Sequence, residues 1–377
     1  MSKMEKDVFV VADNVFSPIG KTTAENFDRL RKNIPGVKEQ NNPAISPRLF
    51  FASLFNDGDI NIKAGRTKFE QLLIESVADA LQNSSIDPTD KKTILIISST
   101  KGNISLLEKE EHTPELKKRI ALTTSARLVA EHFGFVNTPI IISNACISGV
   151  MGVITGMRLL RTGQYENAVV TGADVISSFI LSGFESFQAL SPQVCRPFDK
   201  SRDGLNLGEG AATIILSTNK KFDGNIKVLG GSVSNDANHI SGPSRTGKEL
   251  SFAIEQSLKE AGLSADDIDF ISAHGTATPY NDEMEAKAIN LSQLQSVPLN
   301  SLKGYYGHTL GAAGLIESAI SIQSLKEGLL LATPGYSELG VTQPVNVIAD
   351  MLPTQAKSFL KTASGFGGCN AAIIFGK

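Results

Sequence analysis

The sequence predicts an α/β fold that is built from two similar halves. Strand-like runs alternate with helical patterns along all 377 residues, which is typical of this fold class. Residues 208–217 (GEGAATIILS) and 367–376 (GGCNAAIIFG) both lead from a glycine turn into a strand of the same length. Cys146 and His308 each stand before a helix start made of small residues. These parallels indicate that one structural plan occurs twice in the chain.

The expected strands are short apolar runs, rich in β-branched residues and bounded by turn residues. They lie at 8–16, 93–99, 138–143, 166–172, 212–217, 226–234, 268–273, 297–301 and 370–375. The expected helices are segments whose apolar residues recur at helical spacing, two of them with glycine stops at Gly163 and Gly328. They lie at 22–32, 67–83, 118–133, 148–162, 247–262, 283–293 and 312–327.

The seam between the halves is expected in the polar stretch 217–225 (STNKKFDGN). We therefore expect an N-terminal half at 1–219, which contains Cys146, and a C-terminal half at 220–377, which contains His274 and His308. The two halves are expected to pack into one compact unit.

Composition and charge narrow the classes of function. Hydrophobic residues make up 41% and charged residues 20% of the chain, as in a soluble globular protein. The formal net charge of -3 argues against a dedicated binder of nucleic acid or anionic membrane. Three cysteines without a pairing pattern favour a reduced, cytoplasmic setting, and the N-terminal apolar run is too short for a signal peptide.

An uncharged stretch surrounds the first cysteine. No Asp, Glu, Lys, Arg or His lies between Phe133 and Met157. Because Pro139 and several polar residues and glycines interrupt the stretch, we expect a buried strand that runs into a buried helix, and no membrane span.

Cys146 is the first candidate for chemistry. The helix that begins after it would direct unpaired N–H groups and the positive end of its dipole at the sulfur, which favours the thiolate and lowers the thiol pKa. The same N–H groups can stabilise a developing oxyanion. The alternative is an inert buried cysteine. Cys195 and Cys369 are interpreted as packing residues.

Two of the five histidines have the strongest case for function. His274 ends an apolar strand and precedes a Gly/Thr loop, where α/β proteins place reactive groups. His308 precedes a helix start, as Cys146 does. Each could instead hold a loop by hydrogen bonds. His239, in a polar loop, could also line a site.

Motifs for metals and nucleotides are missing from the sequence. There is no HxxxH or CxxC spacing and no glycine-rich phosphate loop, so we expect neither a metal nor a bound cofactor. Glu317 lies in an otherwise apolar helical run and would need a partner, for which Lys303 is the nearest candidate. The alternative is that Glu317 is exposed on a polar helix face.

The motifs together resemble the β-ketoacyl-acyl-carrier-protein synthases of the elongating class, in the thiolase superfamily. The resemblance covers nearly the whole chain, and its markers are ACISG at 145–149, RPFDKSRDGLNLGEGAA at 196–212, HGTATPYND at 274–282, KGYYGHTLGAAGLIE at 303–317 and SGFGGCNAAIIF at 364–375. It implies a thiolase-like, five-layered αβαβα fold and a dimer.

The resemblance also implies the reaction. Cys146 would accept an acyl chain from a phosphopantetheine thioester, while His274 and His308 would promote decarboxylation of a malonyl thioester and stabilise the enolate. The enolate would then attack the acyl-cysteine in a Claisen condensation. A second histidine at 308 separates this class from Cys-His-Asn relatives. Lys303 and Glu317 match a pair that supports the histidines.

Further residues are implied as substrate contacts. The backbone N–H groups of Cys146 and Phe366 would form the oxyanion hole, and Phe366 would also be a gate beside the cysteine. Thr276 and Thr278 would hold the pantetheine arm, and Gly367 is expected in the same pocket.

Lys101 falls where an acyl tunnel is usually apolar or glycine. It suggests a specialised enzyme of polyene or polyketide synthesis, unless it turns to solvent in an ordinary fatty-acid enzyme.

The expected partner is an acidic acyl carrier protein, for which Arg66 and Lys68 are candidate docking residues. An ordinary solvated helix start is an equally good interpretation of these two cations. The assembly would be a homodimer or a heterodimer with a related subunit. A non-catalytic or partner-dependent subunit of a heterodimer stays open as an alternative. A cysteine hydrolase is disfavoured, because it would give His308 no role.

Overall fold

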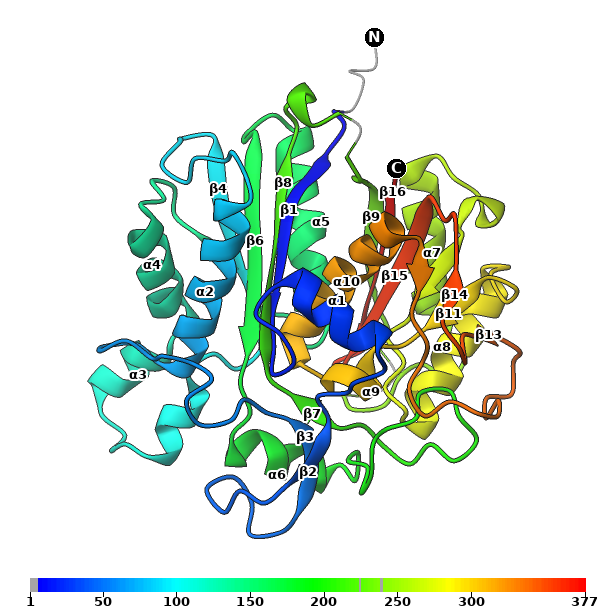
Figure 1. Ribbon diagram of the computed structural model, residues 1–377, viewed down its shortest axis with the longest axis horizontal. Helices are drawn as coiled ribbons and strands as arrows, with labels where there is room; N and C mark the ends of the chain where they lie inside the picture. The colour runs from blue at the N-terminus through cyan, green and yellow to red at the C-terminus, as the bar shows by residue number, and fades with distance from the viewer. Residues whose placement is uncertain (1–5, 224, 238–239) are drawn as a thin grey trace.

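The computed structural model describes residues 6–223, 225–237 and 240–377 of the chain (Figure 1). Its helices are α1 (Thr23–Arg31), α2 (Lys68–Gln82), α3 (Pro114–Ile120), α4 (Leu122–Phe133), α5 (Ser148–Arg161), α6 (Ser178–Ser186), α7 (Lys248–Ala261), α8 (Pro279–Leu291), α9 (Lys303–Tyr306) and α10 (Ala313–Glu327). Its strands are β1 (Phe9–Phe16), β2 (Lys38–Gln40), β3 (Phe50–Ser53), β4 (Thr93–Ser98), β5 (Ile140–Ile142), β6 (Asn167–Asp174), β7 (Leu207–Gly208), β8 (Gly210–Ser217), β9 (Lys227–Asn235), β10 (Phe270–Ser272), β11 (Pro298–Asn300), β12 (Leu329–Leu330), β13 (Asn346–Val347), β14 (Leu352–Pro353), β15 (Ser358–Gly365) and β16 (Cys369–Gly376).

An eleven-stranded sheet in the described part of the chain has the order β13-β11-β10-β15-β16-β9-β1-β8-β6-β4-β5. It contains the same five-strand arrangement twice. In β1-β8-β6-β4-β5 the first two pairings are antiparallel and the last two are parallel, and β9-β16-β15-β10-β11 repeats this pattern. The halves meet where Phe9 of β1 pairs with Lys227 of β9. The two half-sheets repeat one topology, as the two similar glycine-to-strand segments suggested. The boundary between residues 219 and 220 stays a prediction.

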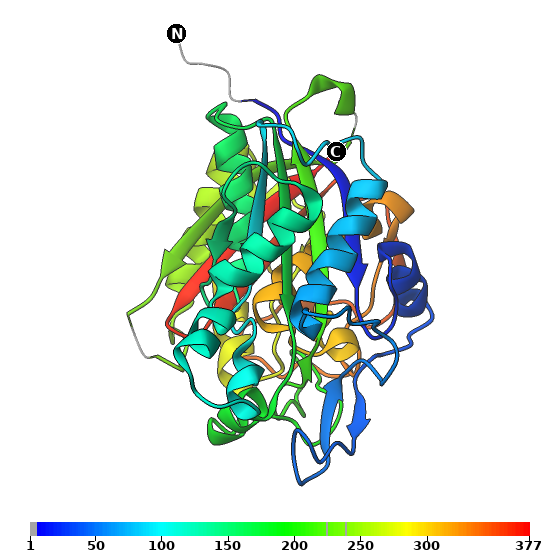
Figure 2. The ribbon, with the colours of Figure 1, turned by 90° about the vertical axis from the view of Figure 1, so that its left-hand side faces the viewer.

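The layers of the fold follow from the packing of helices against the two half-sheets. Helices α5 and α10 lie side by side between the half-sheets, and their buried residues belong to the central core. Helices α2 and α4 cover the outer face of the first half, as Figure 2 shows from that side. Helices α7 and α8 cover the outer face of the second. This is the expected five-layered αβαβα, thiolase-like fold.

The helical patterns explain these positions. Helix α2 begins with a capping box in which Thr67 and Glu70 bond to each other's backbone N–H. Helices α5 and α10 are buried over most of their surface, which suits a layer with a sheet on both sides. Small residues allow their close approach: a Cβ atom on Gly149 would lie 2.9 Å from the backbone oxygen of Gly311.

All nine expected strands are present, with ends that shift by a few residues. The expected helix at 118–133 is two helices, because Ala121 adopts an extended conformation between α3 and α4. The expected helix at 283–293 begins earlier, at Pro279, which suits the first turn because it has no N–H to leave unpaired. Among the described residues, no helix combines the length and the apolar character that crossing a membrane requires. The cytoplasmic location stays a prediction.

Candidate active site

Cys146 lies on a tight connection between β5 and α5. The residue before it, Ala145, has a φ of +42°, a left-handed conformation that costs energy in a residue with a side chain. Ser148 stabilises the turn: its hydroxyl donates to the Ala145 carbonyl at 2.6 Å and accepts from the Asn144 N–H at 2.8 Å. The turn places the Cys146 side chain at the start of α5, where it is buried and lines a cavity.

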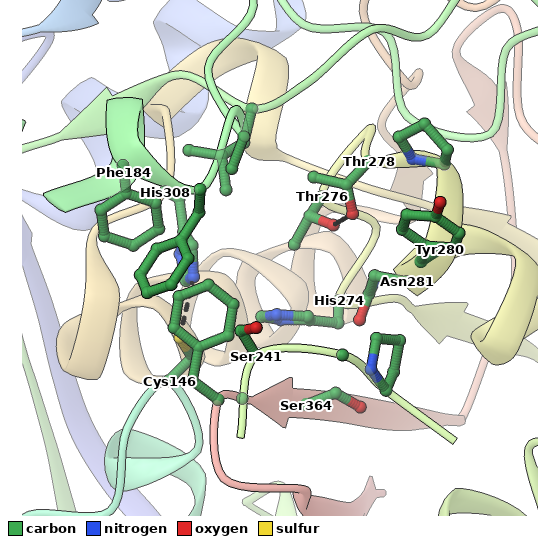
Figure 3. Close-up of a pocket in the computed structure, with 18 of the residues that line it drawn as sticks. Cys146, Phe184, Ser241, His274, Thr276, Thr278, Tyr280, Asn281, His308 and Ser364 are labelled. Atoms are coloured by element: carbon green, nitrogen blue, oxygen red, sulfur yellow. Dashed lines mark hydrogen bonds between the residues drawn. The ribbon is translucent and has the colours of Figure 1, made fainter. Parts of the chain in front are cut away.

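His308 and His274 face this thiol (Figure 3). His308 Nε2 lies 3.0 Å from Cys146 Sγ, and the rings of the two histidines are 5.3 Å apart at 81°. His308 is fixed through its backbone, since its N–H donates to Asn206 at 2.6 Å and its carbonyl accepts from Gly208 at 3.1 Å. His274 follows β10, so the strand end of one half and the helix start of the other meet at one point.

Burial sets the protonation of the three groups. It raises the pKa of Cys146 to about 12, although the N–H of Phe366 hydrogen-bonds to the sulfur and opposes the shift. The expectation of a thiol pKa below its usual value is therefore wrong. Burial, aided by the charges of Lys303 and Lys361, lowers the pKa of both His274 and His308 well below the usual value. At neutral pH the site thus holds a thiol and two neutral imidazoles.

Either atom of the contact between Cys146 Sγ and His308 Nε2 can be the donor, depending on the tautomer of the ring. Nδ1 of each histidine is buried without a hydrogen-bond partner among the described residues, so no contact fixes the tautomer of either ring. Each imidazole can therefore accept or donate a proton on the side that faces the cavity.

A buried ionic cluster lies behind His274. Lys303 donates to the His274 carbonyl at 3.0 Å and forms an ion pair with Oε1 of Glu317. Glu317 is buried, so the partner that the sequence required is present and the exposed alternative is wrong. Its Oε2 pairs with Lys361 at 2.6 Å. The cluster holds the end of β10 against α10.

A second carboxylate holds the backbone of His274 from the opposite side. Glu285 of α8 accepts from the N–H groups of His274 and Gly275, each at 2.8 Å, and from the Thr362 hydroxyl at 2.6 Å. Glu285 is fully buried. The loop that carries His274 is therefore fixed through both its N–H and its carbonyl groups.

The cavity in front of the thiol has a volume of about 390 Å³, which is large enough for a small-molecule ligand. Phe366 lies at its mouth, 38% exposed, and contacts two rings near α6: Phe184, stacked at 5.7 Å, and Phe187, edge-on at 5.2 Å. On the opposite wall Thr276 and Thr278 bond to each other through their hydroxyls at 2.9 Å and line the cavity.

Other expected site residues lie apart from this cavity. Lys101 is exposed and is not among the lining residues, and neither is Gly367, although its neighbours Phe366 and Gly368 are. Lys68 forms an ion pair with the buried Glu209 at 2.6 Å, and Arg66 bonds to Gln71 and His132 beside the start of α2. The functional roles of these four residues stay predictions. His239 lies outside the described residues.

Sequence reasoning missed four residues that shape the site. Glu285 lies in the expected helix at 283–293 and Lys361 in a segment with no expected element, and only their complete burial marks them. Phe184 and Phe187 belong to or follow α6, which was not expected. Their spacing of three residues was the available signal for an apolar helix face.

The matches to protein families and to known proteins agree with this geometry. The family described as beta-ketoacyl synthase, N-terminal domain, matches residues 58–221, and its C-terminal domain matches residues 226–337.

Two curated relatives span most or all of the chain. The chain is 28% identical over 347 residues to a putative mitochondrial 3-oxoacyl-[acyl-carrier-protein] synthase of Schizosaccharomyces pombe, covering 82% of this chain and 81% of that protein. It is 28% identical over 420 residues to 3-oxoacyl-[acyl-carrier-protein] synthase 2 of Vibrio cholerae, covering 100% and 99%. A solved structure, the ishigamide ketosynthase/chain length factor, matches with a TM-score of 0.90 at 25% identity, covering 99% of each chain.

Proposed function

The chain belongs to the β-ketoacyl synthase family of acyltransferases, and on this premise we propose that it elongates an acyl chain held on Cys146. The proposed reaction is a decarboxylative Claisen condensation with malonyl-acyl carrier protein, which yields a β-ketoacyl-acyl carrier protein. The observation that carries the proposal is the 3.0 Å contact between Cys146 Sγ and His308 Nε2, with a second neutral imidazole facing the same cavity.

The first step is acyl transfer to the thiol. As Sγ attacks the thioester carbonyl, His308 Nε2 takes the thiol proton and then gives it to the departing pantetheine sulfur. A site with a thiol pKa of about 12 needs this base, because little thiolate exists at neutral pH. The N–H groups of Cys146 and Phe366 are proposed to hold the oxyanion, and the contact of the Phe366 N–H with the sulfur supports this role.

The second step is condensation. The bond between the malonyl carboxylate and its α-carbon breaks, carbon dioxide leaves, and the electron pair forms an enolate on the thioester. Neutral N–H groups of His274 and His308 donate to the enolate oxygen, which favours charge development there. The α-carbon then attacks the acyl carbonyl, the bond to Sγ breaks, and the Cys146 thiolate takes up one proton from water. No bound cofactor or metal is part of this scheme.

A second candidate is a partner-dependent form of the same reaction. The match to a structure described as a ketosynthase with a chain length factor favours a heterodimer in which a related subunit shapes the acyl pocket. The presence of Cys146, His274 and His308 in one site favours a catalytic rather than a non-catalytic subunit. The exposed position of Lys101 gives no support to a specialised acyl tunnel from that residue, so the substrate class rests on the test below.

Intact-protein mass spectrometry tests the proposal. The protein is mixed with a panel of acyl-carrier thioesters, beside Cys146→Ala, and malonyl-acyl carrier protein is then added. An adduct on the wild type alone that is discharged as an elongated β-keto product supports the condensing reaction, and the best donor defines the substrate. An adduct that is lost as a free acid without malonyl donor contradicts it. Reaction only after addition of a related subunit selects the heterodimer.

A further inference from the structure

Resting on the proposed function, we propose that Lys361 is a positioning residue of this site, a second buried ammonium that fixes the loop of His274 and keeps the two imidazoles neutral. Lys361 is completely buried on β15, and the reaction scheme gives it no part. A lysine in such a position is costly unless its charge is paired and all its N–H groups are bonded. The contacts of the buried Lys361 side chain therefore indicate its role in the site.

The contacts of Lys361 converge on the end of β10. Its Nζ donates to the carbonyls of Ser272 and Ala273, each at 3.1 Å, and Lys303 donates to the next carbonyl, that of His274, at 3.0 Å. Three consecutive carbonyls are thus bonded by two ammonium groups. Regular pairing of β10 with β15 ends at Ser272 and Lys361, so the lysine continues the connection where the ladder stops.

The neighbouring residue holds the other side of the same peptide. The Thr362 hydroxyl accepts from the His274 N–H at 3.3 Å and donates to Glu285. Adjacent residues of β15 therefore reach both the carbonyl side and the N–H side of the segment that ends in His274. A shift of β15 at this point would displace the imidazole.

The cluster of Lys303, Lys361 and Glu317 has one more ammonium than carboxylate, and the nearby carboxylate of Glu285 also acts on Lys361. Lys303 and Lys361 share one carboxylate, that of Glu317, with one oxygen for each ammonium. The excess cation disfavours a further positive charge on either imidazole, and the charge of Lys361 acts in this direction on both histidines. A neutral ring is the form that can take the thiol proton in the first step.

Other ionisable groups also face the two rings, and the effect of Lys361 must be measured against them. They are Cys146 at the start of α5, Glu285 on α8, Lys303 on α9, Glu317 on α10 and each histidine opposite the other. Because Lys303 and Glu317 stay in place, replacing Lys361 alone tests its own charge.

The test reads the histidines directly and needs no turnover. With only five histidines in the chain, ring signals of histidine-labelled protein can be followed by NMR from pH 3 to 8 and assigned with His274→Asn and His308→Asn. In the wild type both rings should stay neutral down to a pH well below 6.5. In Lys361→Met, which removes the charge but keeps a long side chain, at least one ring should begin to protonate at a pH higher by about one unit.

Two comparisons separate charge from packing. Lys361→Arg keeps the cation and should keep both rings neutral, while Lys326→Met breaks an ion pair with Asp13 at the outer end of α10 and should leave the titration unchanged. If Lys361→Met does not fold, Lys361→Gln retains an N–H donor for the β10 carbonyls without the charge. Identical histidine titrations in the wild type and a folded neutral variant overturn the proposal, and so does a wild type whose two rings protonate near pH 6.5.

The readout also separates this proposal from the proposed reaction. Failure of the condensation assay with a positive NMR result refutes the reaction and leaves the role of Lys361 in the ring protonation intact. In an active enzyme, the acidic limb of the pH–rate profile should move upward by about one pH unit in Lys361→Met and stay in place in Lys361→Arg.

Discussion

Removal of the Glu285 carboxylate should uncouple the loop of His274 from α8. In Glu285→Ala the buried Gly275 N–H and the Thr362 hydroxyl lose their acceptor, while the His274 N–H keeps its longer bond to Thr362 at 3.3 Å. Each unpaired group costs about 1 to 3 kcal/mol. The expected loss of unfolding free energy is therefore about 2 to 6 kcal/mol. Glu285→Gln keeps one carbonyl oxygen, so its loss should be about 1 to 3 kcal/mol.

Glu285→Gln should impair catalysis more than it lowers the stability of the protein. A displacement of about 1 Å at a reacting group can lower a rate by about a hundredfold. We therefore expect Glu285→Gln to lower kcat for malonyl decarboxylation at least tenfold with little change in KM.

Urea unfolding and steady-state kinetics measure the two effects. Glu283→Gln, on the same helix but bonded to Thr342 outside the cavity, is the matched control and should change neither quantity by much. A Glu285→Ala protein as stable as the wild type would refute the reasoning, because two buried donors without an acceptor would then have no energetic cost.

Three more changes have defined outcomes. Alkylation of Cys146 by iodoacetamide, located by peptide mass spectrometry, should rise about tenfold per pH unit from pH 8 to 10, because its thiol pKa is about 12; a plateau near pH 9 would indicate an ordinary thiol. Cys195 has a pKa of about 12 when folded, so it keeps its proton between pH 9 and 12 while the unfolded chain loses it, and stability falls as pH rises. Cys195→Ala should reduce that fall by about 1.4 kcal/mol per pH unit in urea unfolding, and an unchanged slope would contradict the assignment. Phe366→Ala removes the ring that contacts Phe184 and Phe187 at the cavity mouth; acyl-Cys146 followed by mass spectrometry should then hydrolyse faster, whereas an unchanged lifetime would show that the ring does not exclude water.

Sequence reasoning located the regular elements and the reactive residues because both leave local signals. The buried strands around Ile96 and Ile214 are nearly continuous apolar runs, and Cys146 and His308 stand at helix starts marked by small residues. Strand β15 escaped because its sequence, SFLKTASG, places a lysine and several polar residues in a fully buried strand. Lys361 is satisfied by β10 and α10 and Thr362 by Glu285 of α8, all distant in sequence, and no local pattern reports such partners.

The pKa of Cys146 was also predicted wrongly from the local sequence. The helix start after Cys146 was visible in the sequence, and it led to the prediction of a lowered thiol pKa. The depth of burial was not visible, and burial raises this pKa above its usual value. Similarly, Lys68 looked like a free surface cation, but its partner Glu209 is 141 residues away. Long-range pairs of this kind decide the charge of a site and cannot be inferred from spacing.

Because β1 lies in the centre of the eleven-stranded sheet, it can pair only after later strands have been synthesised on the ribosome. This strand is synthesised about 200 residues before its main neighbour, β8, ends at Ser217, and β9 follows. At ordinary elongation rates the nascent β1 waits on the order of 10 to 40 s for that neighbour, with both edges open to foreign strands. Strand β16, which begins at Cys369, completes the other half later still. Cellular chaperones that bind the emerging β1 segment should therefore influence the yield of this protein more than those that act after release.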